Sequence, residues 1–367
     1  MDKKFLQNIP EVVLDFTKSL KNQGTYEFLP AKDGLTSYGK SLKLGFSCYA
    51  LKIYYMTGEI TNLTNKELSD WTNYIKSFQK NNYKNFSGYF IDPEYVNYYD
   101  KTLSKETIVS TTKTILNILP TKNYEIKKVK KAKGINAETK QALATLKEVG
   151  KLDKIYLDLD YKNYSDVEKY LNSLDWSKPW SAGAQFSSFC VYSNLLSLNF
   201  EDSLNEYITE LVDFETGSYF AKRPINSREV INGAMKVITG LDWIGGEIHH
   251  PEKLIDYCLT NKPVLEGCDV VDFIYVLYKC SKQKNYKKME INELFTELLN
   301  AILELFVKKD NAFSYFPGYS QTHYYGVPIS KGNESADIHG SLLCLWGILM
   351  ILDNLELINE KCNIIKP

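Results

Sequence analysis

This 367-residue sequence has little arginine, little net charge and no long apolar run. Lys and Arg number 44 against 45 Asp and Glu, the formal net charge is −1, and Arg occurs only at positions 223 and 228. This balance provides no general attraction to phosphate backbones or anionic lipids, so we expect neither a nucleic acid nor a membrane surface as partner. No apolar run reaches the roughly 20 residues that span a bilayer, and the opening residues lack the apolar core of a signal peptide. We therefore expect a cytoplasmic protein.

Motifs for cofactors and activated nucleophiles are also missing. The sequence has no Gly-x-x-x-x-Gly-Lys-Ser/Thr loop, no Gly-x-Gly-x-x-Gly turn, no Gly-x-Ser-x-Gly elbow and no Cys-x-x-Cys pair. Nucleotide-binding, serine-hydrolase and zinc-ribbon functions are thereby excluded, and we expect a site without a cofactor. The seven cysteines are an odd number and most lie in apolar helical stretches, which indicates reduced, buried thiols.

Helical periodicity recurs along the whole sequence in two alternating types. Six segments are nearly apolar and rich in small residues, which predicts burial on all sides; they span about 41–56, 105–119, 182–198, 228–243, 268–280 and 336–352. A more amphipathic segment precedes each of them, at about 4–20, 65–80, 139–150 or 166–174, 202–213, 251–260 and 290–308. The pattern therefore predicts six helical hairpins, each with an outer helix followed by an inner one.

Two internal similarities favour a closed ring of these hairpins. Three aromatic turns match one another at a spacing close to multiples of about 45 residues: 87–90, 217–220 and 313–316. Five inner segments carry Gly near their start, where close backbone approach would require it: Gly45, Gly183, Gly233, Gly267 and Gly340. The last segment is too apolar to cap an open array. We predict an all-α (α/α)6 toroid, a single domain over 1–367, with a basic loop at 127–134 inside an insertion at about 121–165.

The pairing pattern resembles a known superfamily, the α/α toroids that include terpenoid cyclases and protein prenyltransferase β subunits. Residues 75–79, which end in Phe78-Gln79, are followed by Gly88-Tyr89-Phe90, and together they resemble the Gln-to-Gly-x-Trp repeat of triterpene cyclases. Other (α/α) barrel proteins, among them polysaccharide lyases, epimerases and glycosidases, share this architecture. The resemblance implies the toroid fold more directly than any one reaction.

Two family motifs are matched only in part. Class II terpene cyclases protonate their substrate with Asp-x-Asp-Asp, whereas this chain has Asp158-Leu159-Asp160-Tyr161, and that in the insertion. Protein prenyltransferases bind zinc through Asp-x-Cys and a later His, and Glu266, Cys268 and His339 are similar. The resemblance thus implies zinc or magnesium as an alternative to a site without metal.

The main candidate site lies in residues 319–347. A loop with His323, Tyr324 and Tyr325 leads through Glu334 and Asp337 to His339, at the start of the last inner segment. Titratable groups at this position would lie at one mouth of the toroid. We predict that His339 is the acid or base, with Asp337 as its orienting partner and Tyr324 or Tyr325 as a second proton donor. In the alternative interpretation, Asp337 caps the helix.

Other candidate substrate-binding side chains stand near the starts of other helices. Arg223 and Arg228 would bind a carboxylate or phosphate, and Trp180 offers an aromatic face. The remaining candidates are polar or titratable groups: Gln185, His249, His323 and Glu334.

The sequence favours an enzyme that performs acid/base chemistry on an acidic sugar or oligosaccharide, as a lyase, epimerase or glycosidase. Arg, His and Tyr are residue types that such chemistry uses next to a carboxylate. Two alternatives stay open. One is an isoprenoid-diphosphate cyclase or transferase, and the other is a non-catalytic toroid that binds a glycan or a peptide.

Overall fold

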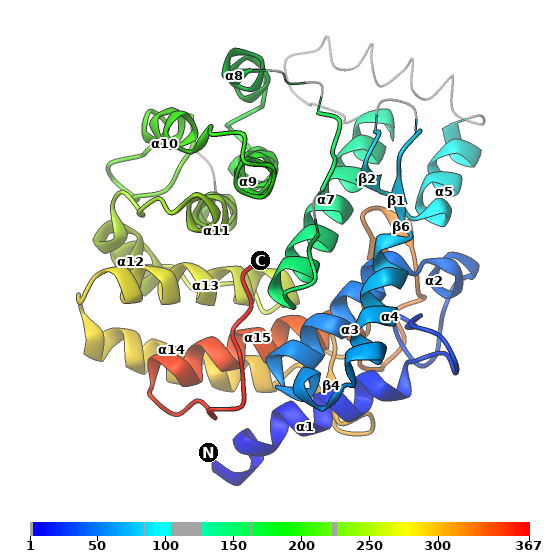
Figure 1. Ribbon diagram of the computed structural model, residues 1–367. Helices are drawn as coiled ribbons and strands as arrows, with labels where there is room; N and C mark the ends of the chain where they lie inside the picture. The colour runs from blue at the N-terminus through cyan, green and yellow to red at the C-terminus, as the bar shows by residue number, and fades with distance from the viewer. Residues whose placement is uncertain are drawn as a thin grey trace.

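A computed structural model describes residues 3–83, 86–103, 127–153, 155–159, 161, 163–221 and 226–367 of the chain. In this part the structure is all-α, with 14 α-helices and only two-residue β-strands (Figure 1). None of the helices described there has the length and apolar character of a membrane span.

Six inner helices form a closed ring. Each one packs against the next, and α15 returns to contact α3, so the predicted ring closure is confirmed. The inner helices are mostly buried because apolar residues occur on several of their faces rather than on one stripe. They are α3 (Leu44–Met56), α7 (Lys127–Glu148), α9 (Pro179–Leu196), α11 (Ser227–Ile244), α13 (Gly267–Gln283) and α15 (Ile338–Asn354).

Amphipathic outer helices surround this ring (Figure 1). Each packs an apolar stripe against one or two inner helices, for example α1 against α3 and α15. The outer helices are α1 (Lys3–Ser19), α4 (Asn65–Lys76), α5 (Pro93–Leu103), α8 (Tyr164–Asn172), α10 (Glu201–Thr209), α12 (Pro251–Thr260) and α14 (Lys288–Leu303). Two short elements complete the set, α2 (Ser37–Ser41) and the 3-10 helix η1 (Glu59–Asn62).

The second inner helix differs from the sequence prediction. The segment 105–119, expected to be inner, lies outside the described residues. Helix α7 instead packs between α3 and α9, so the predictions of a basic loop at 127–134 and of an outer helix at 139–150 are wrong. The lysines of its first turns are exposed or half-buried, whereas Ala142 and Leu143 are fully buried. A helix that is charged at one end and apolar at the other gives the mixed pattern that suggested a loop.

A short hairpin follows four of the outer helices, α1, α4, α10 and α14. In each hairpin a buried aromatic residue ends the returning strand or bridge, namely Phe28, Phe90, Tyr219 and Phe313. The predicted repeat is therefore present in the structure as a repeated hairpin. Its register differs from the sequence match in two copies, and the copy at Phe28 was not recognised. The strands are β1 (Gln79–Lys80) with β2 (Tyr89–Phe90), β3 (Phe306–Val307) with β4 (Ala312–Phe313), and β5 (His323–Tyr324) with β6 (Val327–Pro328), all antiparallel.

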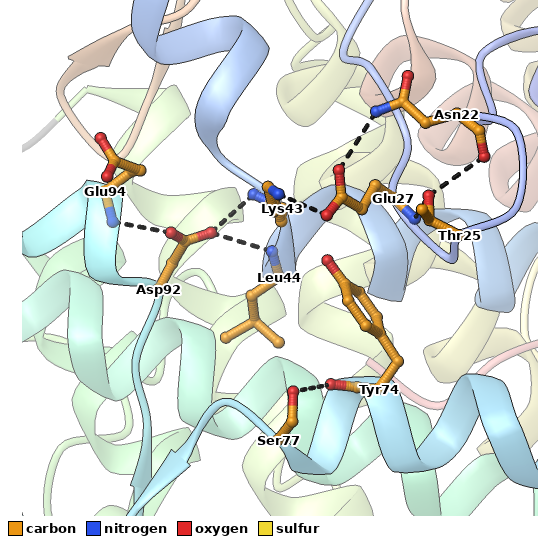
Figure 2. Close-up of polar contacts among 9 residues, drawn as sticks. All are labelled: Asn22, Thr25, Glu27, Lys43, Leu44, Tyr74, Ser77, Asp92 and Glu94. Carbon is orange, nitrogen blue, oxygen red and sulfur yellow. Dashed lines mark hydrogen bonds and ion pairs between the residues drawn. The ribbon is translucent and has the colours of Figure 1, made fainter.

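The buried carboxylate of Asp92 fixes the start of the inner helix α3 and that of the outer helix α5. Asp92 accepts hydrogen bonds from the backbone N–H groups of Lys43 and Leu44, at 2.7 and 3.0 Å, and of Glu94 at 3.0 Å (Figure 2). A negative charge at a helix N-terminus satisfies free N–H groups and complements the helix dipole. Asp92 thereby holds the first turns of α3 and α5 together.

Close packing at the start of α15 requires a residue without a side chain. A Cβ atom added to Gly340 would overlap the backbone of Ser314 and Tyr315. The predicted close approach is therefore present here, and it brings the loop after β4 directly against the first turn of α15.

Candidate functional site

The inner helices enclose a central cavity of about 420 Å³. All six contribute to its lining, together with the loop that contains β5 and with residues near the end of the chain. The lining is mainly aromatic and polar. It includes Tyr49, Lys52, Lys140, Gln141, Trp180, Gln185, Ser188, Lys236, Cys268, Asp272, Tyr315, Gln321, Tyr324, Tyr325, His339 and Trp346.

His339, the second residue of α15, reaches this cavity and is half-buried. Its Nδ1 lies 3.1 Å from Oε1 of Gln321, and its ring stacks on Tyr49 at a centroid distance of 4.6 Å. Because an amide oxygen only accepts, this contact assigns the proton to Nδ1 and leaves Nε2 as an acceptor. Burial, together with the charge of Lys236, lowers the pKa of His339 to about 3. The imidazole is therefore neutral at pH 7 with Nε2 able to accept a proton, and a negatively charged ligand beside it would raise this low pKa toward the range of a general base.

Acid should destabilise the protein through His339. Since its pKa is lower in the folded state, the unfolded chain binds a proton below pH 6.5 that the folded chain does not. The stabilising contribution is complete above pH 6.5 and is lost as the pH falls toward 3. We expect His339→Gln to remove about 2 kcal/mol of the loss in unfolding free energy between pH 7 and pH 5, measured by urea denaturation. The exposed His323→Gln is the control, and an equal loss in wild type and His339→Gln would contradict the assignment.

Three lysines line the same cavity. Lys52 is only 7% exposed, and its ammonium has no hydrogen bond or ion pair within the described residues. The Nζ atom of Lys140 donates to Oγ of Ser187 at 2.8 Å. Burial lowers the pKa of Lys140 to about 7, and the neighbouring charges of Lys236 and Lys52 add to this effect. The three ammonium groups thus repel one another inside a partly dehydrated space.

Asp272 is the acidic member of the lining, and its carboxylate lies 3.4 Å from Nζ of Lys236. Burial raises the pKa of Asp272 to about 6, although Lys236 opposes the shift. With three lysines against one carboxylate, the charged groups of the described lining leave a positive excess that a negatively charged ligand would neutralise.

Asp337 does not orient the His339 ring as predicted. Its carboxylate accepts from the backbone N–H groups of Gly340 at 2.7 Å, Tyr315 at 2.8 Å and Gln321 at 3.0 Å. It is therefore the N-cap of α15 and also holds the loop that carries Gln321, the hydrogen-bond partner of the ring. Burial raises the pKa of Asp337 to about 6 even though these N–H groups favour the ionised form.

The two predicted tyrosines both line the cavity, in different settings. Tyr324 is buried against Gly45 and Phe46, and its hydroxyl has no hydrogen-bond partner within the described residues. Burial raises its pKa, and the nearby carboxyl group of Glu138 adds to the rise. Tyr325 is 40% exposed and belongs to the open side of the cavity.

The other predicted binding residues are divided between the cavity and the surface. Trp180 and Gln185 line the cavity, and Gln185 Oε1 accepts from the Tyr170 hydroxyl at 3.2 Å. Arg228 stands behind Trp180, 5.3 Å from its ring, and is paired with Asp269 at 2.9 Å. The positions outside the described cavity lining are His249, His323 and Glu334, and Arg223 lies outside the described residues.

The residues of the zinc alternative do not come together as a set. Cys268 and His339 both line the cavity, but Glu266 pairs with Arg228 at 3.3 Å. Burial raises the pKa of the Cys268 thiol to about 12. Among the residues that the structure describes, no group of three or more His, Cys, Asp or Glu side chains is arranged to hold a metal ion.

No protein-family model and no curated protein matches this sequence. Two solved structures of the GH76A alpha-1,6-mannanase of Salegentibacter sp. HEL1_6 are similar to it in fold. One, an inactive variant in complex with alpha-1,6-mannotetrose, is 10% identical, with a TM-score of 0.50 over 95% of this chain and 99% of that chain. The other is also 10% identical, with a TM-score of 0.47 over 96% and 99%. At such identity the first match shows the (α/α)6 toroid fold alone, and it supports the broad toroid resemblance rather than terpenoid cyclases in particular.

Proposed function

We propose that this chain is a carbohydrate-active enzyme that binds an acidic sugar in the central cavity and moves a proton beside the carboxylate of that sugar. The observation that carries the proposal is the presence of three lysines, aromatic side chains and a neutral His339 in one cavity. Ammonium groups in a partly dehydrated space attract a carboxylate strongly. Aromatic rings such as Trp180 and Tyr315 offer flat apolar surfaces for the faces of sugar rings.

The proposed proton transfer uses the groups of the lining in distinct roles. Nε2 of His339 takes the proton from the carbon next to the carboxylate. The lysines stabilise the negative charge that develops on the carboxylate as the C–H bond breaks. In an elimination, the electron pair of that bond forms a C=C bond while the C–O bond to the next sugar breaks, and the Tyr325 hydroxyl protonates the departing oxygen. In an epimerisation, a proton returns to the opposite face of the same carbon.

Proton transfer fits this lining better than hydrolysis by a pair of carboxylates. Inverting and retaining glycosidases place two carboxyl groups on either side of the scissile bond. Within the described residues, Asp272 is the single carboxylate side chain of the cavity lining. A base at His339 with cations nearby needs no second carboxylate.

The experiment tests binding and chemistry together. The protein is incubated in D2O with hexamers of galacturonate, glucuronate and mannuronate, and with neutral hexamers as controls. We expect deuterium at the carbon beside the carboxylate, or the ultraviolet absorbance of a conjugated carboxylate, with the acidic chains only. New reducing ends without either signal would overturn the proton transfer. Binding of geranyl diphosphate without binding of any uronate would overturn the assignment of the substrate class.

The affinity for the acidic sugar should depend on the protonation of Lys140. Since the pKa of Lys140 is about 7, its ammonium loses its proton as the pH rises above 7, whereas the sugar carboxylate stays ionised. We expect about a tenfold loss of affinity between pH 6 and pH 9, measured by calorimetry. Lys140→Met should bind more weakly at pH 6 and keep only the smaller decline that comes from ionisation of Asp272, whose pKa is about 6. The exposed Lys66→Met is the matched control, and a flat wild-type profile would contradict this role.

A further inference from the structure

Residues 363–367, here called the floor segment, cross the ring at the ends of three inner helices. Asn363 binds the end of α3, through its N–H to the Met56 carbonyl at 3.0 Å and through Nδ2 to the Tyr55 carbonyl at 2.9 Å. The N–H of Lys366 donates to Glu148 at the end of α7. Figure 1 shows this red segment ending near the middle of the ring.

Further contacts tie the floor segment to α11. Nζ of Lys366 donates to the Asp242 carbonyl at 2.7 Å and lies 4.8 Å from the ring of Trp243. The indole N–H of Trp243 donates to the Pro367 carbonyl at 2.9 Å. Three inner helices therefore hold this segment in a fixed position.

The floor segment closes one end of the central cavity. Ile365 and Pro367 line the cavity, and Ile365 is 5% exposed. Three lining residues on the opposite side, Trp180, Gln321 and Tyr325, are partly or fully exposed and lie at or near the starts of the inner helices. The cavity is thus open at the N-terminal ends of the inner helices, and the floor segment lies across its C-terminal end.

The side wall between α7 and α9 separates this cavity from a second one. The second hollow, of about 560 Å³, shares only Gln185 and Ser188 with the central lining. Gln185 is buried and accepts a hydrogen bond from Tyr170, which fixes the amide in the wall. A chain that enters the central cavity therefore meets a wall there as well as a floor.

Lys52 and Lys236 are attached to deeper turns of the inner helices than His339. Lys52 lies eight residues beyond the first residue of α3, and Lys236 lies nine beyond that of α11, whereas His339 lies one beyond that of α15. At 1.5 Å per residue the Cα atoms of the lysines are about 10 Å farther from the helix starts than that of His339, and their side chains lean back toward those starts. The charge of Lys236 acts on His339, so a carboxylate drawn to the lysines would still place its neighbouring carbon within reach of His339.

We propose that the floor segment makes this cavity an end-binding site, which accepts an acidic chain by one terminal unit only. The terminal sugar enters through the open mouth with its carboxylate toward Lys52 and Lys236, and the rest of the chain extends outward past His339 and Trp180. An internal stretch of a longer chain does not fit, because the floor segment lies across the other end of the cavity. This inference rests on the proposed function for its ligand class and adds the mode of binding.

The test compares hexauronates that carry a bulky fluorophore at one end or the other. Calorimetry on the wild-type protein is expected to show that one labelled hexamer binds like the unlabelled chain, and that the other binds at least about 100-fold more weakly. Equal affinity of both labelled chains, or loss of both, would overturn end binding while the proposed function stands. Failure of every unlabelled uronate to bind would overturn the proposed function, and end binding with it.

A second experiment removes contacts that hold the floor segment in place. The double variant Asn363→Ala with Lys366→Ala removes side-chain contacts of the floor segment with α3 and α11, and Lys361→Ala is the exposed control. We expect the double variant to bind the excluded labelled hexamer at least tenfold more tightly than wild type does, with its helical circular dichroism unchanged. If a folded double variant still excludes that chain as strongly as wild type, the floor segment does not set the binding mode.

Discussion

Replacing Lys52 with Met is expected to make the protein more stable and at the same time to weaken its binding of an acidic sugar. The Lys52 ammonium is 7% exposed and has no ion-pair partner within the described residues, and burial lowers its pKa. An unpaired charge in such a place costs free energy in the folded state. An apolar side chain of similar length removes that cost, so the unfolding free energy should rise by about 1 kcal/mol or more.

The same substitution removes a charge that would pair with the carboxylate of the ligand. Loss of one partner of a buried charge pair costs about 2 kcal/mol or more, so the affinity should fall about 30-fold. Urea denaturation and calorimetry with a uronate measure the two effects separately. The exposed Lys66→Met controls for the change in net charge and should alter neither quantity strongly. A less stable Lys52→Met protein with undiminished affinity would show that Lys52 serves the fold rather than the ligand.

A substitution that raises stability but weakens binding is typical of a residue that serves ligand binding rather than the fold. Lys52 and Lys236 raise the cost of keeping Lys140 charged, because the three ammonium groups face one cavity. A dianionic ligand, or a carboxylate with one further negative group, would relieve this repulsion most. The positive charge of the cavity thus favours the ionised form of an acidic ligand and disfavours the protonated form of the lysines.

The fold was predictable because hydropathy directly reports burial along a helix. The last inner segment was expected at 336–352 and is α15, Ile338–Asn354. The fifth was expected at 268–280 and is α13, Gly267–Gln283. Prediction failed at α7, where lysines dominate the first turns and where small buried residues, such as Gly134 and Ala142, carry little hydrophobic signal.

The candidate site was predictable only where side chains follow the start of an inner helix. That rule places His339 and Trp180 at the cavity mouth, as in the structure. The deeper lysines were overlooked, although each is a single charge within an apolar run, as in the sequence around Lys52 and Lys236. A lone lysine in such a run can also extend its side chain to the solvent. Only the closure of the ring shows that these lysines face the cavity instead.

The role of Asp337 depends on contacts that the sequence does not display. Two of its three partners, the N–H groups of Tyr315 and Gln321, stand 22 and 16 residues before it in the chain. We therefore expect Asp337→Ala to cost about 3–4 kcal/mol of unfolding free energy, because three backbone N–H groups lose their acceptor and α15 loses its cap. Asp337→Asn keeps one amide oxygen and should cost about half as much.

Chemical denaturation of the two variants, with the exposed Glu334→Ala as a control three residues earlier, measures this role. Proton transfer should also fall in Asp337→Ala, because the loop that carries Gln321 also holds the His339 ring. It should fall much less in Asp337→Asn, which still accepts from the backbone. If instead Asp337→Asn loses all proton transfer while keeping wild-type stability, the carboxylate acts in the chemistry itself and the capping role is secondary. The two variants thus separate a carboxylate that supports the geometry of the base from one that exchanges protons with the substrate.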